Sequence, residues 1–125
     1  MPNGDTAPLE IRLRRRSRVV EVAFADGTRH ALSFEYLRTH SPSAEVQGHG
    51  PGQDVLQIAK ENVGIRAIEP VGQYAVRIVF DDGHDTGLYT WKLLRELGVN
   101  QATNWQRYLE RIDRIGYVRK PKPAG

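Results

Sequence analysis

An internal repeat constrains the fold of this chain more than any other feature of its sequence. Residues 20–27 (VEVAFADG) and 76–83 (VRIVFDDG) have the same order of apolar positions, followed by Asp-Gly. Asp-Gly between alternating segments predicts a β-hairpin, because both central positions of a tight turn tolerate positive φ. One face of each first strand is apolar, so we expect the two hairpins to share one core. The same offset pairs two further leucines of each copy, Leu32 with Leu88 and Leu37 with Leu93.

A short helix is predicted to follow each hairpin. Ser33 and Thr90 are N-cap residues, whose hydroxyl oxygens can accept hydrogen bonds from amides of the first helical turn. Gly98 predicts the end of the second helix. A hydrophobic staple across each cap supports both starts, formed by Leu32 with Leu37 and by Tyr89 with Leu94.

A third helix is predicted from about residue 101 to residue 115. Its apolar residues fall on one stripe at helical spacing, charged residues occupy the other faces, and Gly116 ends it. Core packing explains such a stripe better than a partner surface does. The stripe consists of Trp105, Tyr108, Leu109, Ile112 and Ile115.

Together these elements predict an α+β fold, a small β-rich domain of antiparallel hairpins with two short helices and a C-terminal amphipathic helix. A chain of 125 residues accommodates one such domain. We assign the domain to residues 8–117 and expect residues 1–7 and 118–125 to be disordered tails. The prolines and glycines of residues 40–53 predict a loop without regular structure. Short strands are predicted at residues 55–59 and 65–68.

The sequence contains no cysteine, which excludes disulfides, thiolate metal ligands and cysteine nucleophiles from this chain. It shows neither a secretory signal nor an apolar run of membrane-helix length, so we expect a cytoplasmic protein without a membrane partner. Basic residues are clustered near both ends, and the alternating arginines from Arg12 to Arg18 predict the solvated face of a strand. Nucleic-acid binding through these arginines is an alternative that predicts strong salt dependence. No aromatic residues interleave with them, so nucleic acid is not the expected partner.

Four histidines, His30, His40, His49 and His84, are the residues best suited to act near neutral pH. Zinc or iron needs several convergent ligands, and Glu45 could join three of these histidines, although the spacing matches no specific metal motif. There is no GxSxG motif, and serines beside His40 in the sequence are weak evidence for a catalytic triad. The sequence therefore indicates no catalytic constellation, and we do not expect an enzyme.

Three segments of the sequence are familiar in combination. They are LRTHSPSAEV at residues 37–46, residues 65–72, and FDDGH at residues 80–84. With them the chain resembles the γ-butyrobetaine hydroxylase N-terminal-like domain over about residues 9–109. The resemblance implies a small β-rich domain with short helices. In bacteria this domain also occurs alone, as a family of unknown function, and related copies are attached to Mrp-type P-loop iron–sulfur carriers.

In the hydroxylases, the resemblance implies, this domain carries a structural zinc held by three cysteines and one histidine. The cysteine positions correspond to Ser41, Ser43 and Val46 in this sequence, and the histidine position corresponds to His84. Serine is a poor zinc ligand and valine is none, so we do not expect this zinc site here. The iron and 2-oxoglutarate chemistry of the hydroxylases belongs to a separate catalytic domain, which we do not expect in this chain.

Our leading hypothesis is a non-catalytic accessory or adaptor domain that contacts a protein partner through residues 41–53 and His84. The alternative is a metal- or small-ligand-binding module, linked to iron–sulfur or oxygenase systems, that would bind zinc or iron through His40, His49 and His84. Outside that alternative no cofactor is expected. Neither the partner's identity nor the oligomeric state is indicated. The candidate binding residues are His40, Ser41, Ser43, Glu45, His49 and His84.

Overall fold

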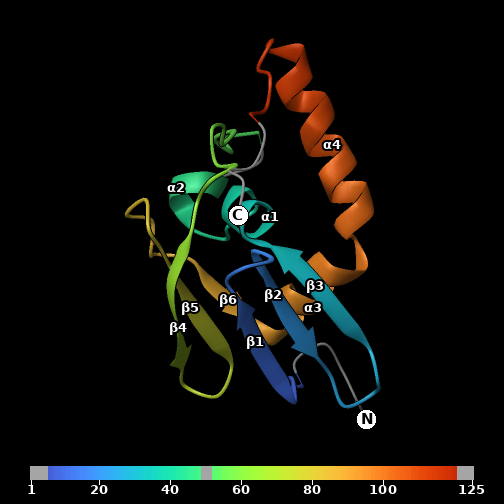
Figure 1. The fold of residues 1–125 in the computed structure, drawn as a ribbon. Coiled ribbons are helices and arrows are strands. Elements are labelled where there is room, and N and C mark those ends of the chain that lie inside the picture. The colour runs from blue at the N-terminus through green and yellow to red at the C-terminus, as the bar shows by residue number, and fades with distance from the viewer. Residues whose placement is uncertain (1–5, 49–51, 121–125) are drawn as a thin grey trace.

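The computed structural model describes residues 6–48 and 52–120, which form two three-stranded antiparallel sheets and four helices (Figure 1). The strand orders are β1-β2-β3 and β4-β5-β6. This architecture confirms the predicted α+β class. In chain order the elements are β1 (Glu10–Arg14), β2 (Val19–Ala23), β3 (Arg29–Ser33), α1 (Phe34–Thr39), α2 (Ala44–Gln47), β4 (Ile65–Val71), β5 (Ala75–Phe80), β6 (Leu88–Thr90), α3 (Trp91–Val99) and α4 (Gln101–Arg114).

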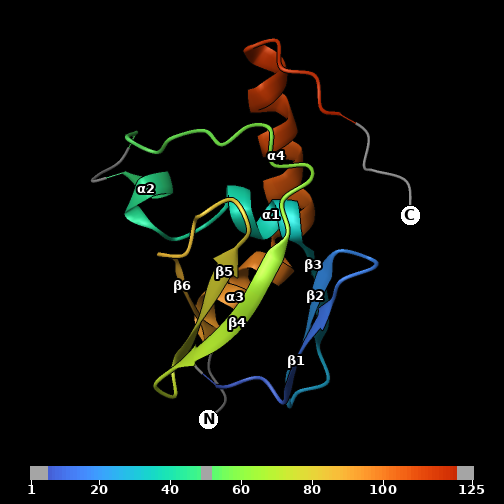
Figure 2. The same cartoon turned by 60° about the vertical axis from the view of Figure 1, so that its left-hand side comes forward.

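One core lies between the two sheets, as the repeat predicts. Val20 and Val22 of β2 and Ile78 and Phe80 of β5 are at most 2% exposed and belong to the same apolar cluster. Helix α3 packs beside the sheets, whereas α1 and α2 lie at one end of them (Figure 2). Helix α4 extends beyond that end (Figure 2). Elements from both copies of the repeat therefore bury their apolar faces together.

The two hairpins differ in register by one residue. Val20 pairs with Leu32 in the first sheet, whereas Val76 pairs with Tyr89 in the second. Tyr89 is fully buried and Leu88 is 39% exposed. Because successive strand residues face opposite sides, one additional residue after the second turn brings Tyr89 into the core. The prediction that Leu88 corresponds to Leu32 is therefore wrong.

Both predicted N-caps are confirmed. Ser33 Oγ accepts a hydrogen bond from the amide three residues later at 3.0 Å, and Thr90 Oγ1 does the same at 3.1 Å. The register difference continues into the helices, so the buried Leu94, and not Leu93, is the counterpart of Leu37. Under the corrected offset of 57 positions, the caps Ser33 and Thr90 correspond to each other, and Arg38 of α1 corresponds to Arg95 of α3.

The predicted end of α3 at Gly98 is wrong, because the helix continues to Val99 and its C-cap is Asn100. A Cβ atom at Gly98 would collide with the ring of His30. Glycine is therefore needed at this position for the close approach of α3 to β3. The predicted end of α4 is confirmed, since Gly116 follows its C-cap with φ +79°.

The segment that joins the two copies is only partly as predicted. It contains the short helix α2, whose N-cap Ser43 accepts a hydrogen bond from the Glu45 amide at 3.2 Å. The strand predicted at residues 55–59 is wrong, because this stretch has no regular structure and no strand neighbour among the described residues. The strand predicted at residues 65–68 is confirmed and extends to Val71 as β4.

Contacts of the folded domain continue past residue 117. The Arg119 guanidinium forms an ion pair with Glu35, and the Lys120 amide donates to a carboxylate oxygen of Glu61 at 2.7 Å. Of the predicted tails, residues 6–7 and 118–120 are described. Residues 1–5 and 121–125 lie outside the described residues. Among the described helices, none is long and apolar enough to cross a membrane.

Candidate functional site

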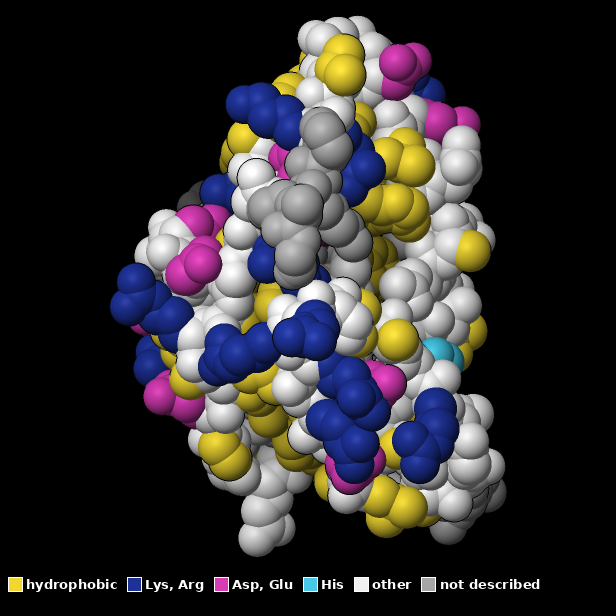
Figure 3. Space-filling view, in the orientation of Figure 1, with side chains coloured by type: hydrophobic (Ala, Val, Ile, Leu, Met, Phe, Trp, Pro, Cys, Tyr) yellow, Lys and Arg dark blue, Asp and Glu magenta, His cyan; other side chains and the backbone are white. Residues whose placement is uncertain are grey.

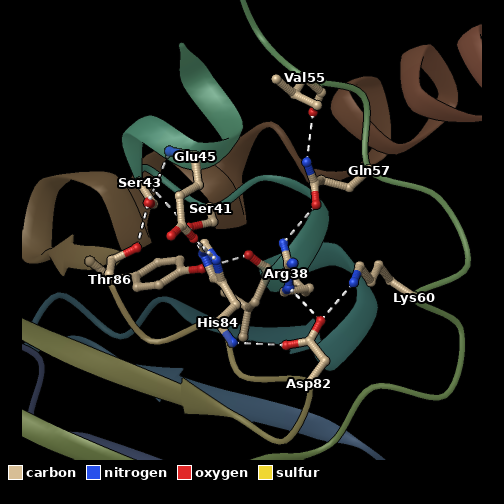
Figure 4. Close-up of polar contacts among 12 residues, drawn as sticks. Arg38, Ser41, Ser43, Glu45, Val55, Gln57, Lys60, Asp82, His84 and Thr86 are labelled. Carbon is tan, nitrogen blue, oxygen red and sulfur yellow. Dashed lines mark hydrogen bonds and ion pairs between the residues drawn. The ribbon is translucent and has the colours of Figure 1, made fainter. Parts of the chain in front are cut away.

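A buried histidine connects the two halves of the chain. His84 lies between β5 and β6 and is 5% exposed. Its Nε2 atom is 2.8 Å from Ser41 Oγ, and its Nδ1 atom is 2.8 Å from Glu45 Oε2 (Figure 4). Beside it, Ser43 Oγ lies 2.6 Å from Thr86 Oγ1. We call Ser41, Glu45 and His84 the His84 network, which attaches α2 and the residues before it to the β5–β6 connection.

Local sequence explains how these side chains meet. The Ser43 cap starts α2 and places Glu45 in its first turn, above the histidine (Figure 4). A Cβ atom at Gly87 would lie 2.6 Å from Ser41 Oγ. Glycine at this position therefore allows the β5–β6 connection to approach Ser41 closely enough for the hydrogen bond.

The hydrogen bonds define the protonation of His84. The Glu45 carboxylate accepts from Nδ1–H, which leaves Nε2 to accept from the Ser41 hydroxyl. Burial and the nearby charge of Arg38 lower the pKa of His84, and the Glu45 carboxylate opposes this shift. The imidazole is therefore neutral at pH 7.

The order Ser41–His84–Glu45 is that of a nucleophile, a base and an orienting acid. Ser41, however, is fully buried, and its Oγ also accepts a hydrogen bond from the Ser43 amide at 3.2 Å. A substrate carbonyl has no access to this hydroxyl. The described geometry therefore gives the His84 network a structural role, in which it fixes the position of α2.

Two ion pairs relate the copies of the repeat reciprocally. Asp82 Oδ2 in the second turn accepts from Arg38 Nε of α1 at 2.9 Å, and Asp26 Oδ2 in the first turn accepts from Arg95 Nη1 of α3 at 3.0 Å. Arg38 and Arg95 are equivalent under the offset of 57. We call these contacts the reciprocal aspartate–arginine pairs. Each turn is thereby bound to the helix of the other copy.

The electrostatics of the two aspartates are similar. Although partial burial opposes ionisation, hydrogen bonds from Lys60, the His84 amide and Arg38 lower the pKa of Asp82 to about 2. Hydrogen bonds from Thr28, together with Arg95, lower the pKa of Asp26 to about 2. Neither arginine was predicted from the sequence to take part in a site. The sequence signal that could have found them is the arginine that each short helix carries at equivalent positions 57 residues apart, Arg38 and Arg95.

The positions that the resemblance assigns to zinc converge only in part. Ser41 contacts His84, but Ser43 Oγ bonds to Thr86, and Val46 offers no donor atom. Both ring nitrogens of His84 already have hydrogen-bond partners. No three His, Asp or Glu side chains of the described residues are placed to hold a metal ion together. This donor set does not fit zinc.

The remaining candidate histidines lie elsewhere. His40 Nδ1 is 3.1 Å from the Tyr36 carbonyl oxygen, and the ring packs on Tyr36 and Tyr108 with centroid distances of 4.6 and 5.9 Å. Burial lowers the pKa of His40, against the backbone carbonyls of Tyr36 and Asn104. His49 lies outside the described residues. His40 therefore has a different environment from His84.

His40 also lines a pocket of about 190 Å³ between α1, α2, residues 54–57 and α4. Helix α4 contributes Arg107 and Arg111 to its wall. Arg111 Nη1 lies 2.9 Å from Asp54 Oδ2 across the pocket. This pocket was not predictable from the sequence, because four separate segments form it and no local pattern connects them.

The arginines near the start of the chain divide into two kinds. Arg12 and Arg14 lie on β1, are exposed and pair with nearby glutamates, as predicted for a solvated face. Arg18 lies after β1 with φ +59°, and its guanidinium donates to the Val63 carbonyl, so the prediction that it continues this face is wrong. Figure 3 shows the Lys and Arg side chains gathered over the region of β1 and β2.

Two hairpin–helix units around a common core, tied by a buried histidine, define this protein as a small two-sheet α+β domain. Residues 11–95 match the family described as Gamma-butyrobetaine hydroxylase-like, N-terminal. The chain belongs to this family. A comparison with curated proteins finds no match.

Solved structures of similar length resemble the chain over most of both sequences. One protein solved by NMR in solution is 43% identical, with a TM-score of 0.79 over 94% of this chain and 93% of that one. A second NMR structure is 48% identical, with a TM-score of 0.80 over 100% and 94%. A crystal structure from Acidithiobacillus ferrooxidans, of a protein with unknown function in the DUF971 family, is 42% identical, with a TM-score of 0.64 over 78% and 98%.

Proposed function

We propose that this chain is a non-catalytic binding domain that contacts a protein partner. The contact surface is formed by α2, residues 53–58 and the pocket-facing side of α4, and we call it the α2–α4 surface. The observation that carries the proposal is the pocket of about 190 Å³ with exposed apolar side chains beside it. Val55 on its wall is 54% exposed, and Ile58 is 39% exposed. Exposed apolar side chains next to a polar concavity are typical of protein interaction sites.

The His84 network holds α2, one part of the α2–α4 surface, in position through the hydrogen bonds of its buried histidine. Ser41 and His84 are buried and position α2, whereas the side chain of Glu45 is 64% exposed while it accepts the histidine bond. Within the predicted binding residues, the partner would therefore meet Glu45 and the His40 pocket, and Ser41, Ser43 and His84 would hold the backbone beneath them.

Site-specific photo-crosslinking in cells tests the proposal. A benzophenone amino acid replaces Ile58 in one variant and Leu88 in a matched control, because both side chains are 39% exposed. A third variant carries the crosslinker at Val55. We expect the Ile58 and Val55 variants to crosslink to the same protein, identified by mass spectrometry, and the Leu88 variant to give no such product. Equal products from Ile58 and Leu88, or none at Ile58 and Val55, would contradict the proposed surface.

We further propose that the domain works without a bound metal, because serine, valine and a doubly hydrogen-bonded histidine make a poor zinc site. A proton–nitrogen correlation spectrum titrated with zinc and then with ferrous iron tests this. We expect unchanged resonances at His40 and His84. Saturable shifts at these side chains would instead support the metal-binding alternative.

A further inference from the structure

The pocket of the α2–α4 surface has an unbalanced set of charges. Arg107 and Arg111 lie one helical turn apart on α4 and line the same pocket. Like charges at this spacing repel each other, and an anion placed between the two guanidinium groups would offset that repulsion. The arrangement therefore favours an anion in the pocket.

One carboxylate already occupies part of this site. Asp54 Oδ2 is 2.9 Å from Arg111 Nη1, and both side chains remain well exposed, at 37% and 41%. Asp54 belongs to a stretch without regular structure, so its carboxylate can be displaced at small cost. Arg107 has no acidic partner within ion-pair distance in the part of the chain that the structure describes. The pocket thus contains a carboxylate–guanidinium contact together with an unused guanidinium beside it.

The other polar groups of the pocket are engaged within the protein. Tyr108 Oη donates to the Gln57 carbonyl at 2.6 Å, and Gln47 Nε2 donates to the Ser41 carbonyl at 2.8 Å. His40 is half-buried, with Nδ1 3.1 Å from the Tyr36 carbonyl oxygen, and burial lowers its pKa. The donors left for a ligand are therefore the two guanidinium groups, whose planar fork matches a carboxylate.

We propose that Arg107 and Arg111 bind a carboxylate group of the protein partner in this pocket, carried by its C-terminus or by an acidic side chain. This inference deepens the proposed function, because it rests on the same surface and names the chemistry that is recognised. A volume of about 190 Å³ is below the roughly 300 Å³ at which pockets begin to enclose drug-sized ligands. It accommodates a carboxylate on a short carbon chain.

Titration of the purified, nitrogen-15-labelled chain with succinate tests the proposal, with sodium chloride at matched ionic strength as the reference. We expect saturable shifts of the Arg107 and Arg111 side-chain resonances and of the backbone of residues 54–57, with no such shifts in chloride. An Arg107→Gln variant should bind about tenfold more weakly or worse, the loss expected for one charge-assisted hydrogen bond. An Asp54→Asn variant should bind more tightly, because it removes the competing carboxylate.

Arg114→Gln is the matched control, since Arg114 is an exposed arginine of the same helix that does not line the pocket. Equal weakening by the two arginine variants, or no saturable shift with succinate, would overturn the proposal. A crosslink at Ile58 would then still support the proposed protein-binding function. Failure of the carboxylate proposal is therefore distinguishable from failure of that function. A short peptide with a free C-terminal carboxylate, compared with its amidated form, tests whether a protein carries the group. Preference for the free peptide over succinate supports the proposal, and preference for succinate overturns it in favour of a small acid.

Discussion

The two turns that follow β2 and β5 share a hydrogen bond from a backbone amide but differ in the contacts of their side chains. In each turn an aspartate accepts a hydrogen bond from the amide two residues later, at 3.0 Å for Asp26 and Thr28 and at 3.2 Å for Asp82 and His84. In the first turn the Thr28 hydroxyl donates to Asp26 and accepts from Arg95 Nη1 at 3.3 Å, and both contacts are exposed. In the second turn the His84 side chain reaches Ser41 and Glu45, which lie 43 and 39 positions earlier.

This difference separates the features that both copies share from those that only the second copy has. The strands, caps and reciprocal aspartate–arginine pairs are common to both copies and serve the shared core. The buried contact of His84 with Ser41 occurs where the second copy departs from the first, in residues 81–87 between β5 and β6. The departure from the repeat thus positions α2 and, through it, the proposed binding surface.

The largest loss of stability should come from removing the core side chains that pair with β2 and β5, Leu32 and Tyr89. Leu32→Ala and Tyr89→Ala should each lower the free energy of unfolding by about 3–5 kcal/mol, because each removes a fully buried side chain. Leu88→Ala should change it by less than about 1 kcal/mol, since this side chain is 39% exposed. Urea denaturation measures all three. Similar losses for Leu88→Ala and Tyr89→Ala would show that the one-residue shift is wrong.

His84→Ala should destabilise the domain by about 2–3 kcal/mol, because it leaves the buried Ser41 hydroxyl without its partner. Thr28→Ala, at the equivalent place in the first turn, should cost at most about 1 kcal/mol, since the bonds to Asp26 and Arg95 that it loses are exposed. A double-mutant cycle with Ser41→Ala measures the coupling across the two halves. Additive effects of Ser41→Ala and His84→Ala would contradict the contact.

The reciprocal aspartate–arginine pairs should differ in strength. Asp82→Asn should lower the free energy of unfolding by about 1–3 kcal/mol, because the Arg38 side chain is only 8% exposed and would lose its charged partner. Asp26→Asn should have a smaller effect, since the Arg95 side chain is 22% exposed and that of Asp26 is 46% exposed. Denaturant titrations of both variants make the comparison, and a larger loss for Asp26→Asn would refute it.

The smallest effect concerns pH between 7.5 and 5.5. Burial lowers the pKa of His84 in the folded state, so on acidification below about pH 6.5 the unfolded chain takes up a proton before the folded chain does. Stability should therefore fall as the pH falls through this window. His84→Gln should flatten the dependence, leaving the part that comes from the lowered pKa of His40. The same slope in variant and parent, measured by denaturation at both pH values, would count against this account.

Local chemistry made much of the fold predictable. The Asp-Gly turns and the caps at Ser33 and Thr90 depend on neighbouring residues alone. Both caps are confirmed, and in each turn the glycine has positive φ whereas the aspartate does not. The register of the second hairpin was not predictable in the same way. Both Leu88 and Tyr89 are apolar, so only the pairing with β5 decides which of them faces the core.

The residues of the His84 network were predictable, whereas their hydrogen-bonded arrangement and the pocket beside α4 were not. His84, Ser41 and Glu45 were all named from the sequence, and the structure joins them by hydrogen bonds. Arg38 was not named, because its partner in the second turn lies 44 positions away. Long-range polar contacts of this kind depend on how the two copies dock, which no local pattern encodes.

The reciprocal aspartate–arginine pairs also have a kinetic consequence. Each hairpin–helix unit is built from residues close in sequence, so its formation needs little loop closure and can be fast. The pairs join residues 44 and 69 positions apart and require both units to be in place. Interactions that form after the transition state slow unfolding without accelerating folding. We therefore expect these two pairs to set the lifetime of the folded domain, while the rate of its formation is set by the hairpins.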